Sequence, residues 1–279
     1  MPKTVLITGT SKGIGRDTVL RFARAGWNVA ATMRDRADAD PAFAGFPNIA
    51  VFRLDVTDPY TIADAIAKTG DRFGQIDAVV NNAGYGQAGF FEAVTDAELR
   101  ANFETNFFGT ANVMRAILPG MRARRDGVIL NVTSVGATFG IPSSGSYVAT
   151  KWALEGLCES MWHELSAAGV RLKVLEPAGV ATPFLTAPSY SRATVGIDDY
   201  EDYYARFMQA MGADHWALEQ PEVIADRIFD AVTDGSDRFR YFAGPPLQWL
   251  RDAKRSMTDQ DYEQFMAERF RSPVSVTAG

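Results

Sequence analysis

A tyrosine and a lysine four residues apart are the side chains with the clearest capacity for chemistry in this sequence. On a helix, Tyr147 and Lys151 would lie on one face, so a phenol and an ammonium would point to the same place. A phenol ordinarily keeps its proton up to a pKa of about 10, and a neighbouring cation lowers that pKa. Such a tyrosine can act as an acid or a base near neutral pH. The spacing alone is common by chance, so its meaning depends on the rest of the chain, including Ser134 thirteen residues before the tyrosine.

The elements that must position these side chains follow from alternating patterns along the chain. Short apolar runs at residues 3–8, 28–32, 49–54, 76–80, 127–132 and 170–175 predict strands, and longer helical patterns separate them. These runs are rich in Val, Ile and Leu without strict alternation, which favours a parallel sheet covered on both faces. Repeated alternation of strands and helices predicts a single doubly wound, Rossmann-like α/β domain over residues 1–279, with about seven strands.

Helix signals define several of the connecting elements. The predicted helices cover residues 14–25, a segment opened by Asp58 and Pro59, a segment from Thr95 toward Leu118, and residues 145–167 and 221–232. Thr95 and Glu98 form a capping box, and a proline directly after Asp58 suits the first position of a helix. Residues 239–242 predict the last strand.

The pattern loosens after Pro183. We interpret residues 184–220 as a substrate-loop insertion, with weak helix near residues 203–211, and residues 246–279 as a helical tail that frays at its end.

Composition excludes several classes of protein. The 279 residues carry a formal net charge of −6, which argues against a nucleic-acid-binding surface. No apolar stretch approaches the ~20 residues of a membrane helix, and the first residues pass directly into a predicted strand, so we expect a cytoplasmic protein without a signal peptide. The single cysteine, Cys158, fits a reducing compartment and a buried packing role. His163 and His215 lie far apart, so no metal site is expected.

A glycine-rich turn follows the first predicted strand and opens the first helix. Its glycines, Gly9, Gly13 and Gly15, have the spacing G-x-x-x-G-x-G. Glycines let the backbone approach a phosphate closely, and a helix N-terminus supplies N–H groups and a positive dipole. The position between a strand and a helix predicts dinucleotide binding. The residues expected at the cofactor in this turn are Gly9, Ser11, Lys12, Gly13, Ile14 and Gly15.

These motifs together resemble those of the short-chain dehydrogenase/reductase family. The glycine spacing is combined with Asn81-Asn82-Ala83-Gly84 after the fourth predicted strand. Ser134, Tyr147 and Lys151 match the catalytic set of that family, and Asn106 matches its fourth member. The resemblance covers roughly residues 3–184, with the motifs in the family's order. The second strand and the long tail also look like the branch that contains 17β-hydroxysteroid and retinol dehydrogenases.

The resemblance implies hydride transfer between a nicotinamide cofactor and a carbonyl or alcohol carbon. In the reducing direction Tyr147 would donate a proton to the carbonyl oxygen, and Ser134 would hydrogen-bond that oxygen. Lys151 would lower the pKa of the tyrosine and hold the nicotinamide ribose. Asn106 would anchor a water that links Lys151 to solvent.

The end of the second strand indicates which cofactor is used. An NAD site usually places an acidic residue there to hold the ribose 2′-hydroxyl. Here the strand ends at Arg34, whose guanidinium suits a phosphate, and Lys12 could add a second positive charge. We therefore expect NADP, with NAD as the alternative, because Asp35 could still turn inward.

Other cofactor contacts follow from the same resemblance. Asp55 and Val56 match the residues that contact the adenine ring, and Asn82, Ala83 and Gly84 match the wall beside the ribose. After the sixth strand the family has P-G-x-V-x-T, and here Pro177, Val180 and Thr182 keep that register. Ala178 replaces the expected glycine, and Gly179 follows it.

The substrate should lie against residues 135–144, residues 85–91 and the segment after Pro183. The aromatic and apolar residues in these segments are Phe90, Phe139, Ile141, Phe184, Leu185, Tyr190, Tyr203, Tyr204, Phe207, Met208, Met211 and Trp216. A pocket formed by them would favour a lipophilic or aromatic ketone, aldehyde or alcohol. Packing in the core or in a subunit interface is the other interpretation of about half of them.

Two other functions are considered. Some relatives have lost catalysis and serve as NADP(H)-binding sensors or regulators, but these usually lose the tyrosine or the lysine, which this chain retains. Lyase, epimerase or dehydratase chemistry is disfavoured because the G-x-x-G-x-x-G loop of extended epimerases is absent. A homodimer or homotetramer through the helices that carry Asn106 and Tyr147 is expected from the resemblance, although core packing also explains the apolar positions of those helices.

Overall fold

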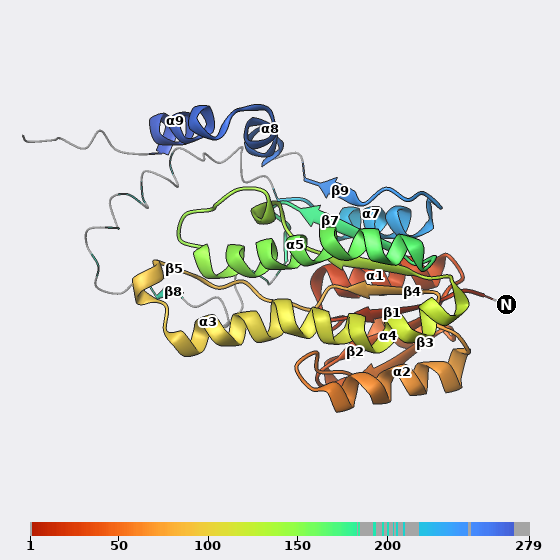
Figure 1. The fold of residues 1–279 in the computed structure, drawn as a ribbon. Coiled ribbons are helices and arrows are strands. Elements are labelled where there is room, and N and C mark those ends of the chain that lie inside the picture. The colour runs from red at the N-terminus through yellow and green to blue at the C-terminus, as the bar shows by residue number, and fades with distance from the viewer. Residues whose placement is uncertain are drawn as a thin grey trace, which may run out of the picture.

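A seven-stranded, entirely parallel sheet forms the centre of the computed structural model (Figure 1). The structure describes residues 2–182, 184, 192–193, 197, 200, 203, 205, 209, 218–244 and 247–270. The strands follow the order β3-β2-β1-β4-β6-β7-β9. Their bounds are β1 (Thr4–Thr8), β2 (Asn28–Met33), β3 (Ile49–Arg53), β4 (Ala78–Asn81), β6 (Val128–Val132), β7 (Arg171–Pro177) and β9 (Arg240–Ala243). The predicted doubly wound α/β fold is confirmed.

Helices cover both faces of this sheet, because each strand buries side chains on both of its sides. On β1, Val5 and Ile7 belong to one core cluster and Leu6 to the other. The first cluster includes residues of α1 (Gly13–Arg24) and α7 (Pro221–Thr233). The second includes residues of α2 (Pro59–Phe73), α4 (Thr110–Arg124) and α5 (Gly145–Ala167), with Cys158 fully buried as predicted.

Helix α2 shows how local sequence sets the ends of an element. The side chain of Asp58 accepts a hydrogen bond from the N–H of Tyr60, and Pro59 takes the first helical position, where a proline loses no hydrogen bond. The helix stops at Gly74, whose φ of 85° lies in the left-handed region. The helix predicted from Asp58 and Pro59 is therefore present, with the expected cap.

The helix predicted from Thr95 toward Leu118 is longer and less regular than expected. It consists of α3 (Asp96–Phe103), a π-helical segment η4 (Glu104–Gly109) and α4, which ends at Arg124. The capping box of Thr95 and Glu98 is present. The end at Leu118 was wrong because Pro119 is accommodated inside α4, which continues until Arg125 adopts a left-handed conformation.

The C-terminal part of the described chain adds β9 to the sheet edge and two further helices, α8 (Gln248–Ser256) and α9 (Asp259–Phe270). These helices contribute Leu250 and Tyr262 to a third apolar cluster, which also contains Val135 and Phe139 from the loop after Ser134. The helical tail is thus present, and it packs against the loop beside the predicted catalytic serine. The part of the tail beyond residue 270 lies outside the described residues.

A small second sheet was not predicted. It pairs β5 (Ala88–Gly89) with β8 (Arg192–Ala193) in parallel, which brings part of the predicted substrate-loop insertion back to the segment after β4. The weak helix predicted near residues 203–211 falls mostly outside the described residues, as do Leu185, Tyr190, Tyr204, Phe207, Met208, Met211, His215 and Trp216. The remaining described elements are η1 (Arg36–Asp38), η2 (Pro41–Gly45), η3 (Phe91–Ala93) and η5 (Val135–Ala137).

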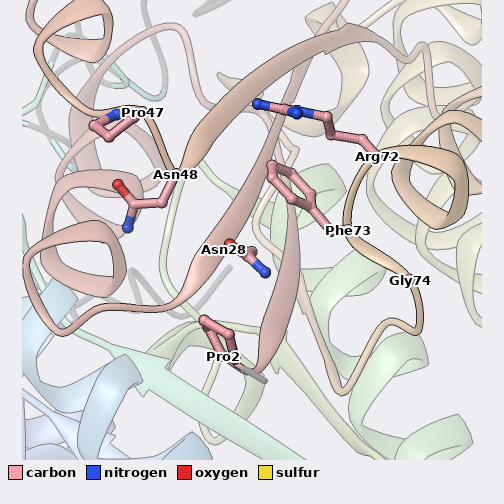
Figure 2. A pocket seen from close by; sticks show the side chains of 7 residues that line it. All are labelled: Pro2, Asn28, Pro47, Asn48, Arg72, Phe73 and Gly74. Atoms are coloured by element: carbon pink, nitrogen blue, oxygen red, sulfur yellow. The ribbon is translucent and has the colours of Figure 1, made fainter.

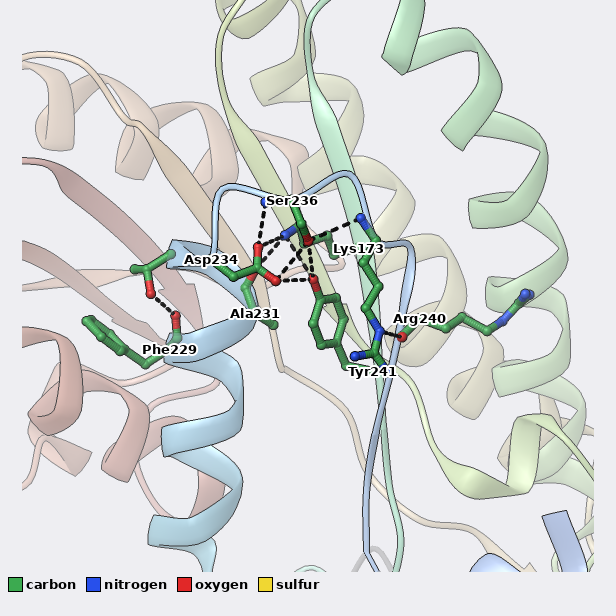
Figure 3. A network of polar contacts seen from close by, with 9 residues as sticks. Lys173, Phe229, Ala231, Asp234, Ser236, Arg240 and Tyr241 are labelled. Atoms are coloured by element: carbon green, nitrogen blue, oxygen red, sulfur yellow. Dashed lines mark hydrogen bonds and ion pairs between the residues drawn. The ribbon is translucent and has the colours of Figure 1, made fainter. Parts of the chain in front are cut away.

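One buried lysine stabilises the edge of the sheet formed by β7 and β9 (Figure 3). Lys173 lies near the amino end of β7 and its side chain is 1% exposed. Its Nζ contacts Asp234 at 2.5 Å, the carbonyl oxygen of Ala231 at 2.7 Å and the hydroxyl of Tyr241 at 3.1 Å. The ammonium has three N–H bonds, so these three acceptors use all of them.

In the part of the chain that the structure describes, none of the helices has both the length and the apolar character needed to cross a membrane. The same residues contain no group of three His, Cys, Asp or Glu side chains placed to bind a metal ion. The predicted cytoplasmic location is not tested by these findings.

Candidate active site

The predicted site residues gather at the carboxyl ends of the strands, where open α/β sheets bind ligands. Gly9 directly follows β1 with a φ of 70°, a conformation that favours glycine. A Cβ atom on Gly9 would lie 2.8 Å from the Cα of Ala83. A Cβ atom on Gly15 would lie 2.2 Å from the carbonyl oxygen of Gly9. Both positions therefore require glycine, and the turn is shaped as a close backbone cradle at the start of α1.

Asn82 holds this cradle against the end of β4. Its side-chain amide donates to the carbonyl oxygens of Thr8 and Gly9, each at 3.0 Å. The hydroxyl of Thr8 in turn accepts from the backbone N–H groups of Asn82 and Ala83 at 3.0 Å. The motif after the fourth strand thus supports the glycine turn directly. Thr8 was not singled out from the sequence, because a threonine at a strand end carries no distinctive signal.

The loop after β7 closes the other side of the cradle. A Cβ atom on Gly13 would lie 3.1 Å from the Cγ2 of Thr182, so the glycine turn and Thr182 are in close approach. Ala178, which replaces the expected glycine, is accommodated because a Cβ atom on Gly244 would lie only 2.2 Å from its methyl group. The missing side chain at Gly244 therefore leaves room for the methyl group at residue 178. Pro177 and Val180 are buried, and Gly179 lies beside Leu218.

Tyr147 and Ser134 form the polar centre of the site. Tyr147 lies in the first turn of α5, and Ser134 lies two residues after β6, where its Oγ accepts from the N–H of Gly136 at 3.1 Å. Burial raises the pKa of Tyr147 to about 12, and a hydrogen bond with Ser134 acts in the opposite direction. Part of the tyrosine side chain still reaches the surface. Burial is thus the largest influence on the pKa of Tyr147, and it raises this pKa. The effect expected from the neighbouring lysine was the opposite, a lower pKa.

Lys151 lies one turn further along α5 and is only 5% exposed. Its Nζ lies 5.8 Å from the centre of the Tyr147 ring and donates a hydrogen bond to the carbonyl oxygen of Val132 at 3.0 Å. Burial lowers the pKa of Lys151 to about 8, and the charge of Glu155 acts in the opposite direction. The lysine can therefore change its charge close to neutral pH.

Asn106 is fully buried in the π-helical segment and joins three parts of the chain. Its Oδ1 accepts from the N–H of Tyr85 at 3.0 Å, and its Nδ2 donates to the carbonyl oxygen of Tyr85 at 2.9 Å and to the hydroxyl of Thr150 at 3.2 Å. A Cβ atom on Gly84 would lie 3.0 Å from this Oδ1 and 3.8 Å from the Nζ of Lys151. Asn106 and Lys151 therefore face the same glycine.

Thr150 was also missed by sequence analysis. Its hydroxyl donates to the carbonyl oxygen of Tyr147 at 2.7 Å and accepts from Asn106. The residue thus links α5 to the π-helical segment. Its position directly before Lys151 could have drawn attention to it, but a helical threonine normally bonds its own helix.

At the end of β2, Arg34 is exposed, as is Lys12 in the glycine turn. Thr10 ties the turn to this strand, since its N–H and its hydroxyl both donate to the carbonyl oxygen of Thr32 at 3.1 Å. Asp35 caps η1 by accepting from the N–H of Ala37 at 2.9 Å. Its carboxylate is therefore engaged in a local turn.

The residues expected around the adenine ring are also placed. The carboxylate of Asp55 accepts from the N–H and the hydroxyl of Thr57, and its own N–H donates to Thr61. Val56 is buried, and a Cβ atom on Gly109 would lie 2.5 Å from its Cγ2. The segment after β3 is thus held firmly against the π-helical segment.

A separate cavity lies away from this region (Figure 2). Its lining residues are Pro2, Asn28, Pro47, Asn48, Arg72, Phe73 and Gly74. Asn28 is the first residue of β2 and Pro2 precedes β1, so the cavity lies at the amino ends of the strands. It contains none of the residues of the candidate active site.

Comparison with known proteins gives a consistent result. The family model described as short chain dehydrogenase matches residues 3–191. A 3-ketodihydrosphingosine reductase of Bacteroides thetaiotaomicron is 29% identical over 96% of this chain and 98% of its own length. The human 17-beta-hydroxysteroid dehydrogenase type 1 is 32% identical over 85% of this chain and 76% of its own length.

Solved structures show the same similarity. A short-chain dehydrogenase from Streptomyces avermitilis has a TM-score of 0.81 at 29% identity, and the match covers 96% of this chain and 98% of the other. ElxO with NADP bound has a TM-score of 0.73 at 25% identity, with 88% of this chain and 97% of the other covered.

Proposed function

This chain belongs to the short-chain dehydrogenase family and is an NAD(P)-binding oxidoreductase. From that premise we propose that it uses NADP(H) to interconvert a carbonyl and a secondary alcohol on an apolar or aromatic small molecule. The observation that carries the proposal is that an acid–base pair and a glycine turn suited to phosphate lie at the same end of the sheet. Tyr147, Ser134 and Lys151 lie at the carboxyl ends of the strands, where Gly9 and Gly15 leave no room for a side chain.

The residues of the cradle fit the pyrophosphate of a dinucleotide. Positions 9 and 15 hold the backbone too close to its neighbours for a Cβ atom, Gly13 has a φ of 59° that favours glycine, and the turn leads into the N-terminus of α1. Thr182 closes the same region from the loop after β7. When bound there, the nicotinamide cofactor supplies or accepts the hydride.

The chain's own groups then handle the proton. In the reducing direction Tyr147 donates its proton to the carbonyl oxygen, a transfer suited to a phenol whose pKa is raised by burial. Ser134, whose hydroxyl lies near that of Tyr147, donates to the same carbonyl oxygen as negative charge develops there. Lys151 holds positive charge beside the tyrosine and stabilises the phenolate that the transfer leaves.

Asn106 supports this acid–base centre by holding the backbone around it in place. Its hydrogen bonds to Tyr85 and Thr150 hold the end of β4 and the catalytic helix at a set separation. Lys151 also lies near Gly84, since a Cβ atom there would be 3.8 Å from its Nζ. Asn106 thereby fixes the backbone next to the lysine.

Charge at the end of β2 supports NADP rather than NAD. Arg34 and Lys12 are exposed cations, and Asp35 uses its carboxylate to cap η1 rather than to accept from a ribose hydroxyl. A related structure, ElxO, carries NADP. The 2′-phosphate is therefore assigned to Arg34 and Lys12.

An apolar substrate is supported by the surroundings of Tyr147. The ring of Phe184 contacts the ring of Tyr147 edge to face, with 5.7 Å between the centroids. The rings of Phe90 and Tyr200 also contact each other, at 4.7 Å. Relatives named for a ketodihydrosphingosine and for a hydroxysteroid agree with this chemical class. Of the predicted substrate residues, Phe139 is buried in the third apolar cluster and packs with the tail.

We also propose a homodimer or homotetramer. Phe108 and Trp152, on the π-helical segment and on α5, expose 43% and 46% of their surfaces, more than is usual for large apolar side chains. Size-exclusion chromatography with light scattering, compared between the native protein and the Phe108→Ser/Trp152→Ser double variant, tests this assembly. An unchanged mass would contradict it.

The function is tested with a panel of ketones, aldehydes and secondary alcohols, followed at ~340 nm with NADPH, NADH and their oxidised forms. We expect turnover of lipophilic or aromatic members with NADPH. Tight NADPH binding without turnover of any member would instead favour a sensor.

The cofactor assignment has a matched pair of variants. Arg34→Asp should reduce the preference for NADPH over NADH by about tenfold or more, because a charge-assisted contact to phosphate is replaced by repulsion. Arg36→Asp makes the same charge change two residues away, on the exposed face of η1. Equal effects of both variants would reject Arg34 as the residue that reads the phosphate.

A further inference from the structure

A buried carboxylate lies directly behind the catalytic lysine. Glu155 is one helical turn after Lys151 on α5, and only 6% of its surface is exposed. Its Oε1 accepts from the hydroxyl of Thr133 at 2.8 Å, and Thr133 is the residue before Ser134. Its Oε2 pairs with Nε of Arg240, from β9, at 3.1 Å. The carboxylate is therefore held by the residue that follows β6 and by β9.

A second buried carboxylate, Glu176, lies near Arg240 but pairs more closely with Arg251, which leaves Arg240 available to Glu155. Glu176, 1% exposed near the end of β7, lies 3.5 Å from Nε of Arg240 but only 2.9 Å from Nε of Arg251 on α8. Arg255 adds a more distant contact to Glu176 at 3.8 Å. Two buried carboxylates and three guanidinium groups thus belong to one ion-pair network beside α5.

The charged groups that act on Glu155 come from every packed element. Burial raises its pKa, and so does the charge of Glu176 on β7, whereas Thr133, directly after β6, and Arg240 on β9 lower it. On α5 itself, Glu155 has Lys151 on one side and Cys158 and Glu159 on the other, and Glu159 also pairs with Arg240. The hydroxyl of Thr133 and the guanidinium of Arg240 are the groups that favour an ionised Glu155.

Lys151 needs such a neighbour. Burial disfavours its charged form, its described hydrogen bond is to a neutral carbonyl oxygen, and Glu155 contributes the largest of the charges that favour the ammonium. The stabilisation of the Tyr147 phenolate depends on that ammonium being charged.

We propose that Glu155 is a positioning residue of this active site: its carboxylate, fixed by Thr133 and Arg240, keeps the buried ammonium of Lys151 charged and in place beside Tyr147. This role deepens the proposed function and rests on it for its effect on turnover. Glu155 acts through Lys151 and does not itself contact the reacting atoms.

The test measures the lysine directly. Lysine side chains are labelled with nitrogen-15, and the ammonium signal of Lys151 is assigned by its loss in Lys151→Arg and then titrated by NMR. We expect a midpoint near pH 8 in the native protein, as the lowered pKa of Lys151 requires. In Glu155→Gln, which keeps an acceptor for Thr133 but removes the charge, the midpoint should move lower by about one pH unit.

Glu159→Gln is the matched control. It removes a carboxylate from the same helix and from the same arginine, but one turn further from Lys151. We expect a much smaller shift. An unchanged midpoint in Glu155→Gln, or an equal shift in both variants, would overturn the proposal.

A second variant keeps the test decisive if Glu155→Gln does not fold. The double variant E155Q/R240Q removes both charges of the buried pair, and Glu176 keeps Arg251. Glu159 also loses Arg240, but its side chain is exposed and water can solvate it. Its Lys151 midpoint should also fall.

Turnover supplies an independent readout. In carbonyl reduction, the high-pH limb of kcat/KM should move lower in Glu155→Gln together with the NMR midpoint, and less in Glu159→Gln. A limb that stays in place while the midpoint moves would overturn the positioning role. Absence of turnover in the native protein would count against the proposed function alone, because the NMR titration needs no turnover.

Discussion

Two buried lysines at opposite ends of the sheet show how one residue type takes two roles. Lys151 and Lys173 are 5% and 1% exposed, and each has its ammonium near a tyrosine ring, at 5.8 Å from Tyr147 and 5.2 Å from Tyr241. Lys173 uses its three N–H bonds on three acceptors, one of them a carboxylate. In the described part of the chain, Lys151 has a single hydrogen bond, to a backbone carbonyl oxygen.

The difference lies in the partners rather than in burial. A buried charge that is fully paired is stable and has no bond left for another molecule. A buried charge with spare N–H bonds can act on a neighbour or a ligand, and its pKa responds to its surroundings. Lys173 is therefore a structural lysine, and Lys151 has the features of a chemical one. Each prediction below changes one side of this contrast.

The largest expected effect is on turnover at the Lys151 end. Tyr147→Phe removes the only proton that the ring can give, so turnover should fall by about 1,000-fold or more, the range of general acid–base catalysis. Binding of NADPH, measured by fluorescence titration, and the midpoint of thermal unfolding should stay close to those of the native protein. Substantial residual turnover would remove the tyrosine from the chemistry.

The next effect is on stability at the Lys173 end. Lys173→Met leaves Asp234 without its cation and should reduce the free energy of unfolding by about 3 kcal/mol, the lower part of the range for a broken buried pair. The lower part applies because the Asp234 side chain is 30% exposed and water can solvate it. Urea denaturation measures the change.

Lys151→Met is the matched substitution for that experiment. It removes an ammonium whose described partner is one carbonyl oxygen, so the free energy of unfolding should change little while turnover is lost. A loss of stability as large as that of Lys173→Met would erase the contrast.

A third effect appears only at low pH. Burial alone would raise the pKa of Asp234, but hydrogen bonds from Lys173, Tyr241 and Ser236 outweigh it and lower that pKa well below its usual range. The carboxylate therefore stabilises the fold above its unfolded pKa of about 3.9, and this stabilisation is lost as the pH falls toward the folded pKa. Between about pH 5 and pH 2, the unfolding free energy should fall more steeply in the native protein than in Asp234→Asn. Parallel curves in urea titrations would contradict the assignment.

The smallest effect concerns the tyrosine that is not expected to do chemistry. Tyr241→Phe removes a hydroxyl that accepts from Lys173 and donates to Asp234, which should reduce the free energy of unfolding by about 1 kcal/mol. Turnover per folded molecule should be unchanged. A large loss of turnover would show that the two tyrosine–lysine pairs are coupled.

The contrast also explains which parts of the site were predictable. Tyr147 and Lys151 are four residues apart, so a local helical pattern places them together. Lys173 and Tyr241 are 68 residues apart, and Glu155 and Arg240 are 85 apart, so only the tertiary structure brings them together. The glycine turn was predictable because each required glycine is set by close backbone approach over a short segment.

Fold prediction was limited by the same physics. The strands were identified within about two residues by their apolar runs, because burial on both faces leaves a strong local pattern. The π-helical segment at Glu104–Gly109 was missed, since its additional residue per turn leaves no mark in hydrophobic periodicity. The β5–β8 pair was missed because two strands of two residues each are too short to show a pattern.

The place of β9 at the edge of the sheet has a consequence for the order in which this chain can be completed during synthesis. β9 pairs with β7, yet its first residue, Arg240, is translated 66 positions after its partner Val174, and Asp234 and Tyr241 are also made late. Until those residues leave the ribosome, the ammonium of Lys173 has neither carboxylate nor phenol to bind and keeps its hydration. The nascent protein therefore reaches its final state at this edge only after most of the chain has been made, and a truncation before residue 234 leaves a cation that the sheet cannot bury.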